Sequence, residues 1–405
     1  MSNKNIKVLQ LCYKPPYPVV DGGTIGMYSI GEGLMNNGCE LKILTLYSDK
    51  HPFSKNLMPS NYLEKTRIEG VYTNLTPNVF DALLCVFLGQ SYVIKRFVTD
   101  EMKRLIVKTL KSEYFDIVQI ESMMMAPYIP LIRKHSKAKI TFHCPNVEHL
   151  IWQRLIKSKH LNIFKKWYLK NTALNLKVYE LEHINDFDAV FPVTDVDASY
   201  FKANGCKRLC EGLPIGFDNV EKLPDIISQE HTLFHIGSMD WFPNEQGIRW
   251  FLTEIWDKIH ETMPHIQTFL AGRNMPTWLK NGRWENVNVV GEVDDSILFM
   301  SSKNIMVVPL LSGSGIRIKI LEAMSIGKAI VATSIAAEGI MYENGKNILI
   351  ADTPEEFVKA IKLLDENHDY CKQLGENAFK LIKEKYDTNY IGKKLLDYYN
   401  RILNK

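Results

Sequence analysis

The chain has 405 residues, of which 46% are hydrophobic and 23% are charged, and its formal net charge at pH 7 is +3. This composition is typical of a globular protein that is long enough for two domains, and the small net charge does not by itself indicate a nucleic-acid partner. The seven cysteines are scattered through the chain, so we expect reduced thiols in a cytoplasmic protein rather than disulfides or a zinc site. The sequence begins without the apolar core of a secretion signal, and no segment approaches the ~18 apolar residues of a membrane span.

Strands that alternate with helices are predicted from the first residues onward. An apolar run over residues 6–12 predicts a buried strand, and a helix over residues 24–34 and a second strand follow. The loop before that helix carries Gly22 and Gly23, which would let the backbone approach a ligand without a Cβ in the way. A flexible surface loop explains the glycines equally well. Residues 51–89 predict only one strand and irregular structure.

A helix is predicted over residues 100–112, and three further strands are predicted over residues 117–120, 139–142 and 188–193. The first of these strands ends at Glu121, and the second is followed by a histidine. Residues 139–142 predict a buried strand, and His143 stands at its carboxyl end. Ligands of open parallel sheets bind outside the carboxyl ends of the strands, so His143 is a candidate site residue. A histidine that is hydrogen-bonded inside a loop is the alternative. Asn146 and Glu148 follow in the same loop and are candidates for hydrogen bonds to acceptor hydroxyls.

Residues 150–179 are strongly basic. They contain seven lysines or arginines and no acidic residue, with aromatic and aliphatic residues between them. This pattern predicts a basic amphipathic helix or a pair of helices, which would suit anionic lipid headgroups. A solvated face whose aromatic residues pack inward is the alternative. We therefore hypothesise peripheral contact with an anionic membrane, on its cytoplasmic face.

A charged stretch with a proline, residues 218–229, predicts a linker, after which a new series of strands and helices begins. A strand over residues 232–236 enters a loop that contains Ser238, and we expect Asn244 to cap the helix that follows. This loop lies at the carboxyl end of its strand and is a candidate ligand site.

Two further strand ends supply candidate ligand contacts. Arg273 follows one strand and could bind phosphate, although a surface salt bridge explains it equally well. Gly291 and Val293 follow the next strand, where backbone groups at the sheet edge can hydrogen-bond a nucleobase. These positions add to a ligand site that the following stretch predicts more strongly.

Residues 304–333 predict a strand, a serine- and glycine-rich loop, a helix and a second buried strand. The N-terminus of such a helix carries partial positive charge and unpaired N–H groups, so an anion can bind in the loop at Ser314, Gly315 and Ile316.

The start of this predicted helix also carries charged side chains. Arg317 and Lys319 reinforce the positive end of the helix, and phosphate would compensate both charges. Glu322, one turn further on, can accept hydrogen bonds from a ribose diol. In the alternative interpretation both cations are solvated and Glu322 pairs with Lys319 at a spacing of three residues. Loop, cations and acid together favour ligand binding.

The segment Gly-x-Gly-x-Arg-x-Lys-x-Leu-Glu-Ala-Met, residues 313–324, resembles the signature segment of family-four retaining glycosyltransferases of the GT-B fold. The usual pattern in that family is a Glu, seven residues, a second Glu and then Ala-Met. Glu322 matches the second acid. Ser314 stands where the first carboxylate of the family contacts the donor sugar.

This resemblance implies a fold of two Rossmann-like, doubly wound parallel-sheet α/β domains that face one cleft. The first domain, residues 1–218, would bind the acceptor, and the second, residues 219–387, the nucleotide sugar. The final helix, residues 388–405, would pack back on the first domain. The alternation of about five or six predicted strands with helices in each half agrees with this architecture.

The resemblance also implies roles for single residues. His143 would lie beside the transferring sugar, and the glycine pair of the first loop would face the donor phosphates. Ser238 stands where many members of the family carry an arginine. Arg317 and Lys319 would then supply the missing positive charge.

The implied activity is transfer of a sugar, with retained configuration, from a nucleotide diphosphate sugar to a hydroxyl of a glycan or lipid-linked acceptor, in the synthesis of cell-surface polysaccharide or glycoconjugate. We expect no metal and no other cofactor, because cationic side chains would stabilise the leaving diphosphate. The alternatives are another activity of the same fold, a sugar-nucleotide epimerase or a phosphorylase, and a non-catalytic protein that binds nucleotides or glycans.

Overall fold

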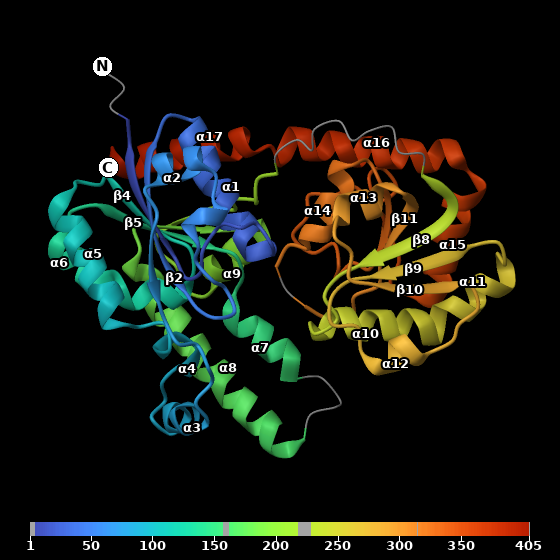
Figure 1. Ribbon diagram of the computed structural model, residues 1–405, viewed down its shortest axis with the longest axis horizontal. Coiled ribbons are helices and arrows are strands. Elements are labelled where there is room, and N and C mark those ends of the chain that lie inside the picture. Colours follow the sequence, from blue (N-terminus) through green and yellow to red (C-terminus); the bar gives the residue numbers. More distant parts are fainter. Residues whose placement is uncertain (1–4, 157–161, 218–227, 314, 405) are drawn as a thin grey trace. The chain divides into compact units, whose positions relative to one another are not determined.

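The structure is a computed structural model that describes residues 5–156, 162–217, 228–313 and 315–404. The chain divides into two compact units, the first formed by Met1–Gly216 with Thr388–Lys405 and the second by Phe217–Asp387 (Figure 1). The candidate Ser314 lies outside the described residues. The linker expected over residues 218–229 also lies outside them, except for residues 228 and 229.

The first unit is built on a seven-stranded parallel sheet in the order β3-β2-β1-β4-β5-β6-β7. Its inner strands are buried along almost their whole length, as expected of a sheet with helices on both faces. The strand order reverses between β1 and β4, and ligands of such sheets bind at the carboxyl ends of the strands around that point. The strands are β1 (Lys7–Cys12), β2 (Glu40–Tyr47), β3 (Glu69–Tyr72), β4 (Ile117–Ile120), β5 (Lys139–Cys144), β6 (Ala189–Pro192) and β7 (Leu209–Cys210).

The helices of the first unit correct the sequence analysis in one place and agree with it in another. Residues 51–89, for which one strand and irregular structure were expected, also form α2 and α3. The basic stretch forms α7 and α8, which agrees with the predicted pair of helices. The apolar pattern of α3 was missed because most of its large side chains are exposed rather than packed in a core. The helices are α1 (Gly22–Asn36), α2 (Ser60–Thr66), α3 (Val79–Phe87), α4 (Tyr92–Lys95), α5 (Asp100–Ser112), α6 (Ile129–His135), α7 (Glu148–Ile156), α8 (Ile163–His183), α9 (Asp195–Ala203) and α17 (Thr388–Leu403).

Helix α17 belongs to the first unit although it ends the chain. It packs on α1 at two glycines: a Cβ on Gly392 would overlap the carbonyl oxygen of Gly33, and a Cβ on Gly33 would lie 2.7 Å from that of Thr388. Only glycine permits so close an approach of two helices. Leu395 and Tyr399 of α17 are buried in the same core as α1 and β1. The first unit is therefore completed by a segment far from it in the sequence.

The second unit contains a six-stranded parallel sheet in the order β10-β9-β8-β11-β12-β13, which reverses between β8 and β11. Its strands are β8 (Gln229–Ile236), β9 (Gln267–Ala271), β10 (Val287–Gly291), β11 (Lys303–Val308), β12 (Ala329–Ala332) and β13 (Leu349–Ile350). The helices are α10 (Phe242–Trp250), which continues through a π-helical segment (Phe251–Ile255) into α11 (Trp256–Thr262), then α12 (Thr277–Asn281), α13 (Ser296–Ser301), α14 (Ile318–Ser325), α15 (Pro354–Glu366) and α16 (His368–Lys385).

Two doubly wound parallel sheets, one in each unit, confirm the fold class that the sequence predicts. Within the described ranges, no helix combines the length and the apolar character that crossing a bilayer requires.

Candidate functional site

The candidate site of the second unit lies where β8 and β11 end, at the reversal of strand order. Both strands are parallel, so the loop after β8, with Ser238, and the loop after β11, with Gly315, leave the same edge of the sheet. This is the edge at which doubly wound sheets bind ligands. The two loops lie next to each other because β8 and β11 are neighbours in the sheet.

Lys319 lies in the first turn of α14, half-buried beneath the loop after β8. Its ammonium nitrogen is 2.7 Å from Asn244 Oδ1 and 3.1 Å from Nε2 of the buried His235. Because His235 Nδ1 bonds the carbonyl oxygen of Val307 at 2.8 Å, it must carry the proton, and Nε2 accepts from Lys319. Lys319 is thus held by two neutral groups. The alternative ion pair with Glu322 is not formed in the part of the chain that the structure describes.

Charge around Lys319 is only partly compensated. Desolvation and, secondarily, the nearby Arg317 lower the pKa of Lys319 to about 7, while Glu322 acts in the opposite direction. Burial and then Lys319 lower the pKa of His235 well below its ordinary value, so His235 stays neutral. Burial raises the pKa of Glu322 although Lys319 opposes this shift. Burial and Arg317 thus disfavour the charged form of Lys319. An anion bound beside the ammonium group would stabilise that form.

Arg317 is buried and positioned by the loop that precedes α14. It is 3% exposed, its guanidinium bonds the carbonyl oxygens of Gly315 and Ile335, and it lies 5.7 Å from the ring centroid of Trp241. A Cβ on Gly313, which has φ +123°, would lie 2.8 Å from this guanidinium. Glycine is required there for both the backbone conformation and the space.

The backbone of this loop offers further donors. Arg317 is the N-cap of α14 and supplies no side-chain cap, and within the described ranges the N–H groups of Gly315 and Ile316 have no acceptor. Unpaired N–H groups before a helix, next to two cations, are the features by which helix N-termini bind anions. The anion site at Gly315 and Ile316 stays a prediction.

Asn244 was expected to cap a helix, and this expectation is wrong. Helix α10 begins earlier, at Phe242 with Trp241 as N-cap, because Pro243 is favourable in a first helical turn. The Asn244 side chain instead donates to the carbonyl oxygen of Ser238 at 2.8 Å and accepts from Lys319. Asn244 is thereby a site residue that the local sequence pattern misassigned.

The remaining candidates of the second unit lie on neighbouring loops. Ser238 donates to the carboxylate of Asp240. Arg273 is exposed and forms no ion pair with any described residue, so the surface salt bridge is absent. The carbonyl oxygen of Gly291 already accepts from the amide of Gly272 at 2.7 Å, and Val293 is half-buried. The structure supplies no direct contact between these residues and Lys319.

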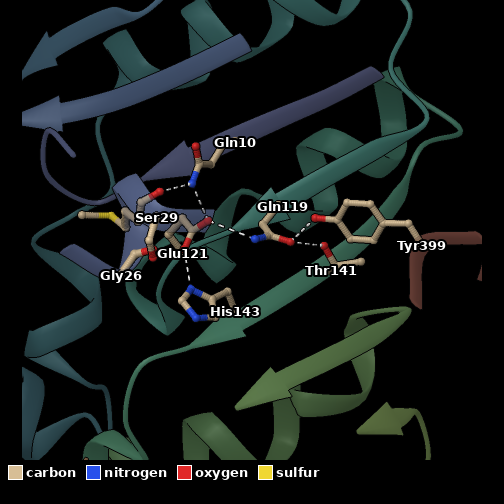
Figure 2. A network of polar contacts seen from close by, with 9 residues as sticks. Gln10, Gly26, Ser29, Gln119, Glu121, Thr141, His143 and Tyr399 are labelled. Carbon is tan, nitrogen blue, oxygen red and sulfur yellow. Dashed lines mark hydrogen bonds and ion pairs between the residues drawn. The ribbon is translucent and has the colours of Figure 1, made fainter. Parts of the chain in front are cut away.

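In the first unit, His143 is the last residue but one of β5 (Figure 2) and is 1% exposed. Its Nδ1 lies 2.7 Å from Oε2 of Glu121, which is fully buried at the end of β4. A carboxylate can only accept, so Nδ1 carries the proton and Nε2 presents a lone pair. Nε2 is buried and has no hydrogen-bond partner among the residues that the structure describes. An unsatisfied buried imidazole nitrogen at the ligand edge of a sheet is a functional signal.

Glu121 is held by a buried polar network (Figure 2). Its Oε1 accepts from Gln10 Nε2 at 2.7 Å and from Gln119 Nε2 at 3.1 Å. Gln119 Oε1 in turn accepts from Thr141 at 3.1 Å and from the hydroxyl of Tyr399 in α17. Sequence analysis had noted Glu121 only as the end of a strand. Its position directly after β4 was the available signal.

The glycine pair of the first loop has an unexpected environment. Gly22 and Gly23 open α1, which Asp21 caps. A Cβ on Gly23 would lie 2.6 Å from the hydroxyl of Tyr13 and 2.9 Å from Nζ of Lys14, which bonds both carboxylate oxygens of Asp21 at 2.6 and 2.7 Å. Gly23 therefore leaves space for Lys14, a role that the sequence did not indicate.

Lys14 borders a pocket of about 380 Å³ at the carboxyl ends of β1, β2 and β3. Lys50, His51 and Arg96 also line it. Two buried polar atoms of its lining residues, Ser48 Oγ and Arg96 Nε, have no hydrogen-bond partner. Unsatisfied donors and cations at one pocket suit an acceptor with anionic or hydroxyl groups.

Glu148, a candidate for acceptor hydroxyls, opens α7. Burial and then Glu180 raise its pKa to about 8, so it is largely protonated at neutral pH and can donate a hydrogen bond. Glu180 itself accepts from the backbone N–H groups of Glu148 and His149 at 3.1 and 2.9 Å.

Residues 230–367 match the protein family described as Glycosyl transferases group 1. The match lies within the second unit. The matched residues extend from β8 to the end of α15 and include Lys319, Arg317 and the loops at the carboxyl edge of the second sheet.

Relatives of the whole chain and of this domain are known. A protein from Klebsiella pneumoniae, described as an uncharacterized 44.6 kDa protein in the cps region, is 22% identical over 95% of this chain and 97% of its own length. A protein from Methanocaldococcus jannaschii, described as an uncharacterized glycosyltransferase, is 31% identical over 31% of this chain and 32% of its own length. The similarity to the Klebsiella protein thus extends over both units, whereas the family match lies within the second.

Among solved structures, HepE from Anabaena in complex with UDP is similar over 98% of this chain and 100% of its own, with a TM-score of 0.66 and 14% identity. This likeness shows the GT-B fold, which agrees with the two parallel sheets of the chain.

The lowered pKa of Lys319 predicts a pH dependence of stability. Between the folded pKa of about 7 and the ordinary value of 10.5 the unfolded chain binds more protons, so stability increases as pH rises through this range, by up to about 1 kcal/mol per pH unit. In Lys319→Met this contribution disappears. Urea unfolding at pH 6 to 9 should show the advantage of the variant over the natural protein shrinking as pH rises. Lys280→Met, at an exposed position, serves as control; stability differences that do not change with pH would contradict the assignment.

Proposed function

We propose that the protein is a retaining glycosyltransferase that moves a sugar from a nucleotide diphosphate sugar to a hydroxyl of a glycan or lipid-linked acceptor. The observation that carries this proposal is the half-buried Lys319 beside the buried Arg317 in the first turn of α14, within a glycosyltransferase group 1 domain. The Klebsiella relative in the cps region supports a role in the synthesis of cell-surface polysaccharide.

The second unit is proposed to bind the donor. Its diphosphate would accept hydrogen bonds from the amides of Gly315 and Ile316 and face Arg317 and Lys319. Negative charge would bring Lys319 back to its charged form, so that binding takes up a proton near pH 7. Solved structures of the Anabaena protein with UDP and with UDP-glucose support a uridine nucleotide as the first donor to test.

In the reaction, the bond between the anomeric carbon and the diphosphate oxygen breaks, and a bond to the acceptor oxygen forms on the same face of the sugar. The acceptor proton passes to the leaving diphosphate. Charge on that group grows toward the transition state, and the preorganised N–H groups and cations stabilise it more than the ground state. We propose that the reaction requires no metal ion, since these cations supply the compensating charge.

The first unit is proposed to bind the acceptor and to supply His143. Glu121 fixes the imidazole with Nδ1 protonated, so Nε2 is directed as an acceptor that can orient a sugar hydroxyl. Lys14, Ser48 and Arg96 line the pocket in which polar groups of the acceptor would be bound.

Replacing both Arg317 and Lys319 by alanine should lower kcat/KM for the donor by roughly 100-fold or more, because the leaving diphosphate loses its compensating charge. Initial rates with a panel of nucleotide diphosphate sugars, and calorimetric binding of UDP, measure the effect. Arg249→Ala, which removes an exposed arginine paired with Glu245 in the same unit, should leave both unchanged. An unaltered KM for the nucleotide sugar in the double variant would refute the proposed donor site.

His143→Ala and Glu121→Gln should lower kcat, by roughly 100-fold for the histidine, with UDP affinity unchanged, because neither residue belongs to the donor-binding unit. Steady-state kinetics combined with UDP binding separates the two effects. Chromatography of the products distinguishes a glycoside from isomerised sugar nucleotide or sugar phosphate, which an epimerase or a phosphorylase would form. A protein that binds UDP and forms no product would instead support the non-catalytic alternative.

A membrane-bound acceptor is supported by an apolar surface of the first unit, here named the α3–α8 surface. It consists of Val79, Phe80 and Phe87 of α3 and Ile163, Phe164 and Trp167 of α8, with Lys165, Lys166 and Lys170. The two helices pack together (Figure 1). The ring centroids of Phe87 and Trp167 are 6.4 Å apart. Phe80 is 87% exposed and Phe164 82%. Exposed apolar groups of this size mark an interaction surface.

The charges of the α3–α8 surface favour an anionic bilayer as its partner. Its three exposed lysines outnumber the single acid of α3, Asp81. Aromatic side chains flanked by lysines are typical of helices that lie in a lipid interface. The surface thus combines the basic stretch that the sequence predicts with α3, a separate helix that contributes much of the apolar area.

Vesicle flotation tests this contact. The protein should float with phosphatidylglycerol-containing vesicles and much less with pure phosphatidylcholine. Lys165→Gln with Lys166→Gln should weaken binding to anionic vesicles about 10-fold or more, and Phe80→Ser with Phe164→Ser should abolish it. Val196→Ser, at another exposed apolar position, is the matched control. Absence of flotation, together with a change of oligomeric state in the Phe variants, would assign the surface to self-association instead.

A further inference from the structure

Two histidines and one buried aspartate converge at the amino edge of the second sheet. His231 Nδ1 lies 2.8 Å from Asp365 Oδ1, and His265 Nε2 lies 2.8 Å from Asp365 Oδ2. The three ligand atoms are all within 4.8 Å of one another. The cluster is far in topology from the donor loops, which leave the opposite, carboxyl edge of the same sheet.

These side chains come from three segments of the second unit, in or next to β8, β9 and α15 (Figure 1). His231 lies near the start of β8, His265 precedes β9, and Asp365 is in the last turn of α15. The pairing of β8 with β11 is irregular between Gln229 and Leu233, and His231 has φ +54°, which is uncommon for a residue other than glycine. Bulges of this kind redirect a side chain and occur beside functional sites. The irregular backbone therefore directs His231 toward Asp365.

The charge of Asp365 requires compensation. Its side chain is only 4% exposed, whereas those of His231 and His265 are 41% and 50% exposed. Asp365 also lies at the C-terminal end of α15, where the helix dipole disfavours negative charge. In the part of the chain that the structure describes, its only ion-pair partners are these two histidines. A cation bound by all three groups would satisfy the carboxylate.

We propose that His231, His265 and Asp365 form a binding site for a divalent transition-metal ion, with Zn²⁺ the best match. Two imidazole nitrogens and one carboxylate oxygen suit Zn²⁺, Co²⁺ or Ni²⁺ and not Mg²⁺ or Ca²⁺, which prefer oxygen ligands alone. The ion would replace the protons that now join each histidine to Asp365. Small outward movements of the exposed imidazoles are sufficient to admit it.

A fourth ligand is available close by. His368 opens α16, is exposed, and its ring centroid is 6.0 Å from that of His231. Rotation of this side chain would complete a tetrahedral site, and water would otherwise take the position. A site closed by His368 would join β8, β9 and the α15–α16 turn. Metal binding would then stabilise the second unit by mass action, independently of its catalytic activity.

Calorimetric titration of the tag-free protein with ZnCl₂, and thermal unfolding with and without the ion, test the proposal. The natural chain should bind one equivalent and show a higher Tm. Co²⁺ should give the strong visible bands of tetrahedral coordination. Asp365→Asn and His231→Ala should weaken binding at least about 100-fold, and His368→Ala by a smaller factor.

Two controls separate this site from other ligands. His260→Ala removes another histidine of the second unit that faces an acid, and Cys206→Ser removes a thiol of the first unit whose pKa is lowered to about 7. Both should bind Zn²⁺ as the natural protein does. Unchanged affinity in Asp365→Asn and His231→Ala, both checked for folding by circular dichroism, would overturn the proposal, as would absence of binding by the natural chain. The cluster would then be a hydrogen-bonded bridge alone.

Discussion

The desolvated ammonium of Lys319 is the constraint around which the second unit is arranged. It lies in the first turn of α14, where the helix dipole already favours an anion, and its partners are the neutral His235 and Asn244. Arg317 adds a second positive charge, fixed by a loop in which Gly313 is sterically required. Such an arrangement is costly in isolation, and the proposed binding of a diphosphate would make it favourable.

In the first unit, buried polar contacts fix the orientation of the His143 imidazole. His143 could present either ring nitrogen, and Glu121 selects the tautomer through Nδ1. Glu121 in turn depends on Gln10 and Gln119, and Gln119 on Tyr399 of α17. The last helix of the chain is therefore part of the support of His143 and not only a cover for the sheet. Networks of this kind are effective only when nearly every member is satisfied. Among the described residues, Gln10 Oε1 and His143 Nε2 are the two atoms of this network that have no hydrogen-bond partner.

The candidate residues lie at different edges of the parallel sheets. Loops at the carboxyl edges hold Glu121, His143 and Lys319, as the topology of doubly wound sheets favours. The amino edge of the second sheet holds His231 and Asp365, whose proposed metal ion would act on stability. The apolar α3–α8 surface is a third region, remote from both in sequence and chemistry, and its exposed aromatic side chains would serve attachment.

The sequence by itself determined the alternation of strands and helices and the bounds of several elements, such as β4 and α5, because these depend on local periodicity and capping. It also indicated Arg317, Lys319 and His143 as candidates, since each follows a strand or opens a helix. Only the tertiary structure decided their partners: Asn244 is 75 residues from Lys319, and Glu121 is 22 residues from His143. Such contacts depend on the order of strands in the sheet, which residue patterns along a single chain do not encode.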